Sequence, residues 1–215
     1  MTTDREQSTG STGRQEHWNQ VYRTKATDNV SWYQTRPETS LSLIAACGLP
    51  ADAAVIDVGG GASVLADCLL DAGFTSLAVL DISGVALAHA RTRLGDRARG
   101  IEWLESDVTA FKPARHYALW HDRAVFHFLT TADDRRRYLD TLCQCLEPEG
   151  HVIIATFATD GPEKCSGLDV RRYDEAMMQR EFGTGFRLIE TRRETHLTPW
   201  QSEQRFIYFR FQRQF

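Results

Sequence analysis

Strand-like and helical stretches alternate through most of this chain, and this alternation constrains the fold more than any other feature of the sequence. Short apolar runs typical of buried strands cover residues 53–58, 76–82, 101–106, 116–122 and 151–157. Stretches with helical periodicity lie between them, over residues 63–72, 84–94 and 132–146. This order predicts βαβ units, in which helices cover both faces of a parallel sheet.

The C-terminal part has a different pattern. Residues 186–195 and 204–213 are two alternating runs, joined by the turn-rich stretch "HLTPWQSE". Two such runs predict an antiparallel hairpin added to the edge of the parallel sheet. The expected fold class is therefore α/β, a doubly wound sheet of seven strands that is mostly parallel and has an antiparallel C-terminal strand.

Length and composition predict one main domain with an appendage. The chain has 215 residues, of which 42% are hydrophobic, which is enough for a sizeable core. Residues 1–14 are polar and rich in Gly, Ser and Thr, so we expect a disordered tail there. Residues 15–50 predict an aromatic-rich cap followed by a helix, and residues 51–215 the α/β domain.

Charge and hydropathy exclude several classes of partner. The net charge of −4 gives no overall basic field for nucleic acid. No apolar run approaches the roughly 20 residues that a membrane span requires, and the N-terminus lacks the apolar region of a signal peptide. We therefore expect a cytoplasmic protein. The 5 cysteines lack the paired spacing of a zinc site, so no metal is predicted.

A glycine turn follows the first strand-like run, in the sequence "VIDVGGGAS". Its spacing is Asp57-x-Gly59-x-Gly61. A dinucleotide fingerprint would require Gly or Ala where Val64 stands, and no Lys-Ser/Thr of a P-loop follows. Asp81 closes the next strand-like run, where a carboxylate can accept hydrogen bonds from both hydroxyls of a ribose. These residues predict a site for an adenosine-containing ligand at the carboxyl ends of the strands.

With these motifs the chain resembles the class I S-adenosylmethionine-dependent methyltransferases, over about residues 17–213. "VIDVGGGAS" is similar to the family's glycine motif and "AVLDIS" to its ribose-binding acid. "ESDVTAF" resembles the adenine-contacting segment, and "YALWHDRAVFHFL" the fourth strand and the loop that meets the methionine end and the acceptor. "HWNQVYRTK" and "VSWYQ" resemble the aromatic segment that closes over the cofactor.

The resemblance implies a Rossmann-like methyltransferase sheet, with residues 51–215 as the catalytic domain. It also implies S-adenosyl-L-methionine as the cofactor and S-adenosyl-L-homocysteine as its product. The residues that it assigns to cofactor binding are Trp18, Tyr33, Asp57, Gly59, Gly60, Gly61, Asp81, Ile82, Asp107, Val108 and His121.

The stretch after the fourth strand indicates the acceptor side. Its "DRA" resembles the "DRGAL" pattern of thiopurine S-methyltransferases and equally the "DKG" pattern of certain seven-strand protein-lysine methyltransferases. This resemblance implies catalytic roles for Asp122, Arg123 and His127. Two alternatives stay open: a packing role for His127, and an ion pair between Arg123 and Asp122.

The chemistry of the acceptor favours a small soft nucleophile, such as a thiol. A thiol ionises near a pKa of about 8.5, so an apolar pocket of Trp32, Phe126, Phe128 and Trp200 would suit its reaction with a sulfonium. For Phe126 and Phe128 a position in the core is the alternative. A lysine amine must lose a proton first, and Asp122 is the one acid near the expected mouth. The alternatives are a protein-lysine N-methyltransferase, which would act on a protein substrate, and a non-catalytic cofactor-binding domain.

The long loop "FATDGPEKCSGLDVRRYD" follows the fifth strand, where it could fold over the site as a lid. Cys165 lies in this loop, and His196 lies in the hairpin link together with Trp200. His196 and Trp200 are candidates for the wall of the acceptor pocket. For Cys165 two alternatives stay open: contact with a soft acceptor, or no part in the site.

Overall fold

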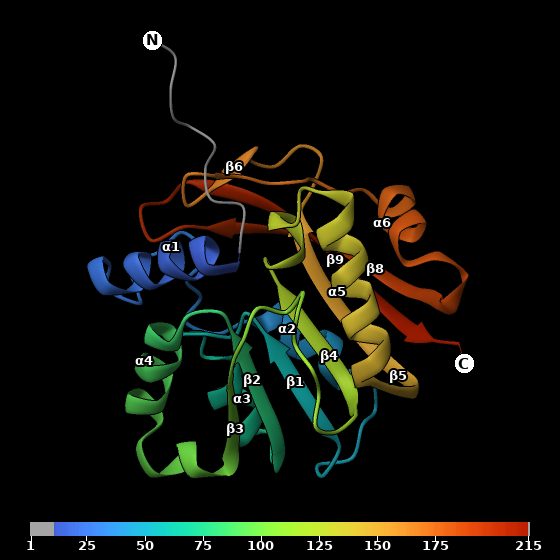
Figure 1. Cartoon of the computed structure of the whole chain (residues 1–215), viewed down its shortest axis with the longest axis horizontal. Helices are drawn as coiled ribbons and strands as arrows, with labels where there is room; N and C mark the ends of the chain where they lie inside the picture. Colours follow the sequence, from blue (N-terminus) through green and yellow to red (C-terminus); the bar gives the residue numbers. More distant parts are fainter. Residues whose placement is uncertain (1–10, 215) are drawn as a thin grey trace.

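The computed structural model describes residues 11–214, and a seven-stranded sheet runs through its centre (Figure 1). Its strands are β1 (Ala54–Val58), β2 (Ser76–Asp81), β3 (Ile101–Glu105), β4 (Tyr117–Arg123), β5 (Leu146–Phe157), β8 (Phe186–Leu197) and β9 (Glu203–Arg213). Their order in the sheet is β3-β2-β1-β4-β5-β9-β8. The neighbours from β3 to β5 are parallel, while β9 is antiparallel to both β5 and β8. The predicted fold class is confirmed.

Helices cover both faces of the sheet (Figure 1). They are α1 (Ser11–Thr24), α2 (Glu38–Ala45), α3 (Leu65–Asp71), α4 (Gly84–Leu94), α5 (Ala132–Cys145) and α6 (Glu175–Phe182). A small hairpin of β6 (Lys164–Cys165) and β7 (Leu168–Asp169) lies in the loop after β5. Short 3-10 turns occupy Gly95–Gly100, Phe126–Phe128 and Gly183–Gly185.

The core divides into two clusters because side chains along a strand point alternately to opposite faces. Ile56 and Trp120 face α5 and α6, in a cluster that includes the ring of Tyr138. Val55 and Leu119, their neighbours along the same strands, face α2, α3 and α4. Every one of these strand residues is almost completely buried, so both faces of the sheet exclude water.

The N-terminal helix corrects one prediction. Helix α1 begins at Ser11, so residues 11–14 are helical and the expected disorder is wrong for them. Residues 1–10 of the predicted tail lie outside the described residues. The reason is a pair of long-range contacts: the Arg14 guanidinium lies 2.8 Å from Asp107 and 3.1 Å from Asp134. Local composition carries no signal for such contacts.

Helix α1 lies beside α4, over the ends of the strands β2 and β3 (Figure 1). Ser83 caps α4 at its N-terminus and donates a hydrogen bond of 2.8 Å to Asn19 of α1. His89 of α4 lies 3.1 Å from the Tyr22 carbonyl oxygen. These contacts hold the N-terminal segment against the sheet domain.

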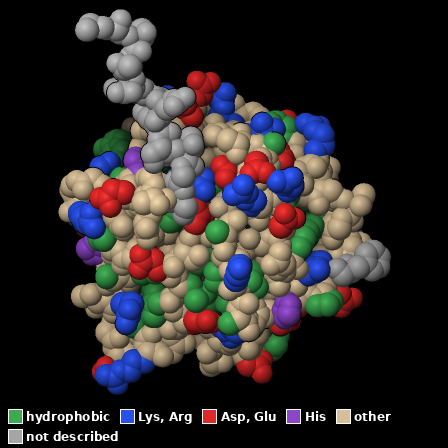
Figure 2. Space-filling model, in the orientation of Figure 1, with side chains coloured by type: hydrophobic (Ala, Val, Ile, Leu, Met, Phe, Trp, Pro, Cys, Tyr) green, Lys and Arg blue, Asp and Glu red, His purple; other side chains and the backbone are tan. Residues whose placement is uncertain are grey.

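On the face that Figure 2 shows, acidic and basic side chains are interspersed and form no continuous basic patch. Within residues 11–214, no helix has both the length and the apolar character that crossing a membrane requires.

Candidate functional site

The carboxyl ends of β1, β2, β3 and β4 converge on two adjoining cavities. The larger, here the aromatic cavity, is lined by Trp18, Trp32 and Phe128 among others and holds about 800 Å³, counting its open mouth. The smaller, here the polar cavity, holds about 600 Å³, and its lining includes Ser40 and His121. The two cavities share the lining residues Tyr22, Trp32, Val58, Gly59 and Arg123.

The glycine turn lies where the two cavities adjoin, and the packing around it leaves no room for a side chain at Gly59 or Gly60. Gly59 has a φ of 69°, in the left-handed region, and a Cβ on it would lie 2.0 Å from a methyl carbon of Val125. A Cβ on Gly60 would lie 2.5 Å from a carboxylate oxygen of Asp57. Gly59 lines both cavities and Gly60 lines the polar one, whereas Gly61 lines neither. Glycine is therefore required at positions 59 and 60, because Val125 and Asp57 pack against the backbone of this turn.

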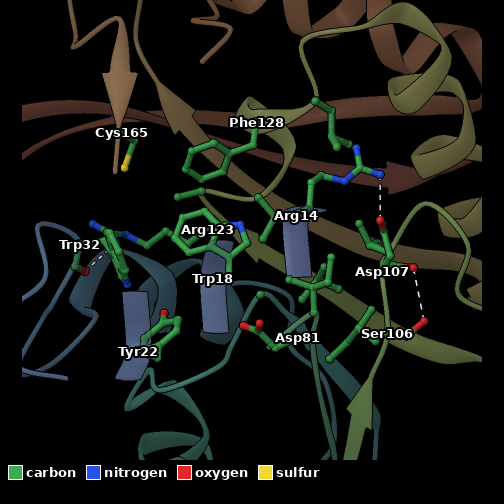
Figure 3. Close-up of a pocket in the computed structure, with 18 residues that line it drawn as sticks. Arg14, Trp18, Tyr22, Trp32, Asp81, Ser106, Asp107, Arg123, Phe128 and Cys165 are labelled. Atoms are coloured by element: carbon green, nitrogen blue, oxygen red, sulfur yellow. Dashed lines mark hydrogen bonds and ion pairs between the residues drawn. The ribbon is translucent and has the colours of Figure 1, made fainter. Parts of the chain in front are cut away.

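Asp81 closes β2 and lines the aromatic cavity next to Ile82. Figure 3 shows Asp81 and Tyr22 on one side of this cavity, with Phe128 and Cys165 on the other. The backbone N–H of Ser83 donates a hydrogen bond of 2.8 Å to Asp81 Oδ1. Burial raises the pKa of Asp81 to about 7, and the negative charge of Asp57 adds to the effect.

Asp107 follows β3 and also lines the aromatic cavity, together with Val108. Its Oδ1 accepts hydrogen bonds of 2.9 Å and 2.8 Å from the N–H and hydroxyl of Thr109. Its Oδ2 accepts one of 2.8 Å from Arg14 (Figure 3). Burial opposes the charge of this carboxylate, yet the donors of Thr109 and Arg14 hold its pKa below the usual value. Sequence reasoning missed Arg14 as a cavity residue, because it lies in the stretch expected to be disordered.

Aromatic rings from two separate segments build the rest of the aromatic cavity. Trp18 of α1 meets Trp32 edge to face at a centroid distance of 5.7 Å and Phe128 at 5.1 Å. Cys165 contributes a thiol from the loop after β5, and burial raises its pKa to about 11. The cavity thus combines apolar ring surfaces with a protonated thiol at one side.

Some residues expected at the acceptor pocket lie elsewhere. Phe126 is fully buried in the core against Tyr138, and Trp200 is 54% exposed in the link between β8 and β9. His196 is buried and its Nε2 lies 2.7 Å from the Ser31 carbonyl oxygen. None of these three predicted wall residues lines either cavity.

A buried polar chain borders the polar cavity. The strand pairing places Asp57 of β1 directly beside His121 of β4, and Asp57 Oδ1 lies 2.7 Å from His121 Nδ1. His121 Nε2 lies 2.9 Å from the hydroxyl oxygen of Ser40 in α2. Asp57, His121 and the predicted residue Tyr33 all line this cavity. Sequence reasoning did not find Ser40, which stands in an ordinary amphipathic helix.

Arg123 lines both cavities, at the end of β4. Its Nε donates a hydrogen bond of 2.9 Å to the Tyr208 hydroxyl, and its Nη1 donates one of 3.0 Å to the Trp32 carbonyl oxygen. Its Nη2 lies 3.6 Å from Glu194. The ion-pair partner of Arg123 is therefore Glu194, and the expected pair with Asp122 is wrong.

Asp122 is fully buried and lines neither cavity, which corrects its predicted catalytic role. Its oxygens accept hydrogen bonds from the N–H groups of Val125 (2.8 Å) and Phe126 (3.1 Å) and from the Tyr138 hydroxyl (2.6 Å). These bonds hold the turn that follows β4. Burial raises the pKa of Asp122 to about 6 in spite of these donors.

His127 is also fully buried away from both cavities, so its predicted catalytic contact is corrected as well. Its Nδ1 accepts a hydrogen bond of 3.3 Å from the N–H of Phe157. Burial lowers the pKa of His127 to about 3, so the imidazole is neutral at physiological pH. The packing alternative is the one that this geometry favours.

One family model matches the part of the chain that contains β1 to β4 and the glycine turn. Residues 55–150 match the family model described as a methyltransferase domain. None of the curated proteins matches the chain.

Several solved structures share the fold. The N-methyltransferase NodS from Bradyrhizobium japonicum WM9, in complex with S-adenosyl-L-homocysteine, is similar with a TM-score of 0.70 and 17% identity, over 91% of this chain and 97% of that chain. A SAM-dependent methyltransferase from Anabaena variabilis ATCC 29413 is similar with a TM-score of 0.74 and 12% identity, over 100% and 99%. A structure on the conversion of a disulfide bond into a thioacetal group during echinomycin biosynthesis has a TM-score of 0.75 and 16% identity, over 93% and 91%.

Proposed function

We propose that this chain transfers a methyl group from S-adenosyl-L-methionine to a small-molecule acceptor. Residues 55–150 match the family model described as a methyltransferase domain, and the fold is similar to that of solved methyltransferases. When bound, this cofactor supplies a methyl group on a positively charged sulfur. One observation carries the proposal: the buried carboxylate of Asp81 lines a cavity directly beside a glycine turn that admits no side chain.

The residues around the aromatic cavity fit the adenosine part of the cofactor. Asp81 would accept hydrogen bonds from the ribose hydroxyls. Asp107 would lie at the exocyclic amine of the adenine, with Val108 against the ring and Trp18 covering it.

The acceptor end of the same cavity favours a thiol or another soft nucleophile. Its walls are the rings of Trp32 and Phe128 and the protonated thiol of Cys165. In the reaction of a thiolate with a sulfonium, two opposite charges disappear, so an apolar environment that excludes water favours the transition state.

The covering of the cavity favours a small molecule over a protein lysine. Trp18 of α1 and Cys165 of the loop after β5 both border the aromatic cavity. An acceptor must therefore fit beneath two chain segments, which suits a compact molecule. The side chain of a folded protein would have to enter between these segments.

Turnover of methyl-labelled cofactor tests the proposal. The purified protein is incubated with labelled S-adenosyl-L-methionine and separate thiols (thiophenol, 2-mercaptoethanol) and amines (benzylamine, glycine), and the products are identified by mass spectrometry. We expect S-methyl products and one equivalent of S-adenosyl-L-homocysteine, and no turnover by the Asp81→Ala variant. N-methylation alone would contradict the thiol assignment. Label that enters only a protein band from a lysate would contradict a small-molecule acceptor.

A further inference from the structure

One side of the aromatic cavity is built from two segments that lie outside the seven-stranded sheet. Phe128 and Leu129 belong to the turn that follows β4, and Cys165 belongs to the loop after β5. In these three residues, here the acceptor wall, Phe128 and Cys165 lie across the cavity from Asp81 (Figure 3). The shape of the cavity on this side therefore depends on what holds the two segments together.

The first segment is held by Arg135 of α5. Its Nη1 donates hydrogen bonds of 3.0 Å and 2.9 Å to the carbonyl oxygens of Leu129 and Thr130, directly after Phe128. The Arg135 side chain is only 10% exposed, and its Nε lies 3.1 Å from a carboxylate oxygen of Glu181 in α6. A buried charge is stable only when an opposite charge and hydrogen bonds compensate it. Glu181 therefore supports Arg135 in the position from which it holds the turn.

The second segment is held by Arg171, near the end of the loop after β5. Its backbone N–H donates a hydrogen bond of 2.8 Å to the carbonyl oxygen of His127 in the first segment. Its Nη2 lies 3.4 Å from the same oxygen of Glu181 that faces Arg135. The β6–β7 hairpin, which carries Cys165, ends two residues before Arg171. Arg171 thus attaches this hairpin both to the turn after β4 and to α6.

The carboxylate of Glu181 compensates two positive charges that come from different segments. Within residues 11–214, no other acid forms an ion pair with Arg135 or Arg171. Without this carboxylate, two guanidinium groups near one point would repel each other in a place where water screens them poorly. We therefore expect the two segments to separate more readily when the charge of Glu181 is removed.

We propose that Glu181 is a positioning residue for methyl transfer, whose ion pairs with Arg135 and Arg171 hold the two parts of the acceptor wall together. This inference rests on the proposed function. None of these three residues lines either cavity, so Glu181 acts through the wall and not by contact with a bound molecule. Its loss should weaken the use of the acceptor and leave the adenosine site at Asp81 and Asp107 unchanged.

Thiol labelling tests the positioning without turnover. The protein is treated with N-ethylmaleimide under native conditions, and the labelling of each cysteine is followed by peptide mass spectrometry. Cys165 is buried in the acceptor wall, and Cys145 is buried in α5. Global unfolding exposes both thiols, whereas separation of the two segments exposes Cys165 alone. In Glu181→Gln the ratio of the Cys165 rate to the Cys145 rate should rise about tenfold or more, the usual effect of losing an interaction with a charged group.

Turnover and ligand binding separate a positioning role from a general structural one. With saturating S-adenosyl-L-methionine, kcat/KM for thiophenol should fall about tenfold in Glu181→Gln, mainly through a higher KM for this acceptor. The affinity for S-adenosyl-L-homocysteine, measured by calorimetry, should stay within about twofold of the wild type. A residue that served only the stability of the fold would not affect the acceptor selectively.

Three further variants keep the result interpretable. Arg171→Met removes only one of the two ion pairs of Glu181, and the Arg171 side chain is 38% exposed, so this variant is informative even if Glu181→Gln is unstable. It should raise the ratio of labelling rates, and Arg171→Lys, which keeps the charge, should restore it. Glu175→Gln is the matched control, because Glu175 lies in the same helix, is exposed and accepts a hydrogen bond from Thr191 of β8. It should behave as the wild type in all three assays.

An unchanged ratio of labelling rates in both Glu181→Gln and Arg171→Met would overturn the inference. An affinity for S-adenosyl-L-homocysteine that falls as much as kcat/KM would also overturn it, because that result would assign Glu181 a general structural role. If the wild type methylates none of the thiols, the proposed function fails, whereas the labelling rates still decide whether Glu181 holds the wall.

Discussion

S-adenosyl-L-homocysteine should bind this protein more tightly as the pH rises through about 7, because its ribose hydroxyls donate to the carboxylate of Asp81. Burial raises the pKa of this side chain to about 7 in the unliganded protein, and the charges of Asp57 and Glu105 add to the shift. A protonated carboxyl offers fewer acceptor sites than a carboxylate. The ligand therefore selects the ionised form.

The size of the effect follows from the pKa. At pH 8 most of Asp81 is ionised, whereas at pH 6 only about one molecule in ten is, when the pKa is about 7. The apparent affinity should therefore fall by about tenfold from pH 8 to pH 6, which corresponds to about 1.4 kcal/mol. Asp107 should contribute no slope in this range, because its pKa lies below the usual value of a carboxyl.

Isothermal titration calorimetry measures both the affinity for the ligand and the number of protons released on binding. Titrations at pH 6 in two buffers with different ionisation enthalpies should show release of nearly one proton for each ligand bound. At pH 8 the release should be close to zero. The Asp81→Asn variant should bind more weakly at every pH and lose the slope, since an amide does not titrate. Asp71→Asn, which removes an exposed carboxylate paired with Arg97, should keep the slope.

The same carboxyl affects the stability of the unliganded protein. Its pKa in the folded state lies above the ordinary value of 3.8, so the folded state binds the proton more tightly than the unfolded chain. The free energy of unfolding should therefore decrease as the pH rises from about 4 to about 7, with a contribution from this group on the order of 4 kcal/mol.

Two results would refute the reasoning on ligand binding. One is an affinity for S-adenosyl-L-homocysteine that stays constant from pH 6 to pH 8, and the other is a pH dependence of that affinity that persists in Asp81→Asn.

Three other predictions test the site and its support. Gly59→Ala should abolish binding of S-adenosyl-L-homocysteine, because its Cβ would lie 2.0 Å from a methyl carbon of Val125. Gly73→Ala is the control: Gly73 also has a positive φ, of 91°, but a Cβ there would meet no atom within 4 Å, so calorimetry should show normal binding. Tyr138→Phe removes the hydroxyl donor to Asp122 and should lower the free energy of unfolding in urea by about 1–3 kcal/mol, while ligand affinity stays within twofold. Arg14→Ala should speed hydrogen exchange in α1 of the unliganded protein, and unchanged exchange would refute the anchoring role of its ion pairs.

The order of strands and helices could be predicted because it depends on local periodicity. Apolar runs of strand length that alternate with helical patterns lead to a parallel sheet, and the carboxyl ends of parallel strands necessarily meet at one edge. The same rule explains why Asp57 and Asp81 could be placed at one edge of the sheet from sequence alone, whereas Asp107 was assigned through the resemblance of "ESDVTAF" to the family's adenine-contacting segment. Each of them stands at or just after the end of a strand, and each lines one of the two cavities.

The turn after β4 could not be predicted in the same way. Asp122, Arg123 and His127 are near neighbours in sequence, yet only Arg123 reaches the cavities. Ala124 has a positive φ of 77°, and the Asp122 carboxylate just before it is fully buried and accepts hydrogen bonds from the N–H groups of Val125 and Phe126. Sequence pattern does not reveal such a turn, because it depends on which distant groups satisfy each side chain.

The sequence by itself determined the sheet, the glycine turn and the acids at the strand ends, since all of these follow from local patterns and from the geometry of parallel strands. Only the tertiary structure decided that Arg14 pairs with Asp107 and that Ser40 joins His121. Residues this far apart in the chain come together when the core packs, and the cost of burying an unpaired polar group then selects their partners.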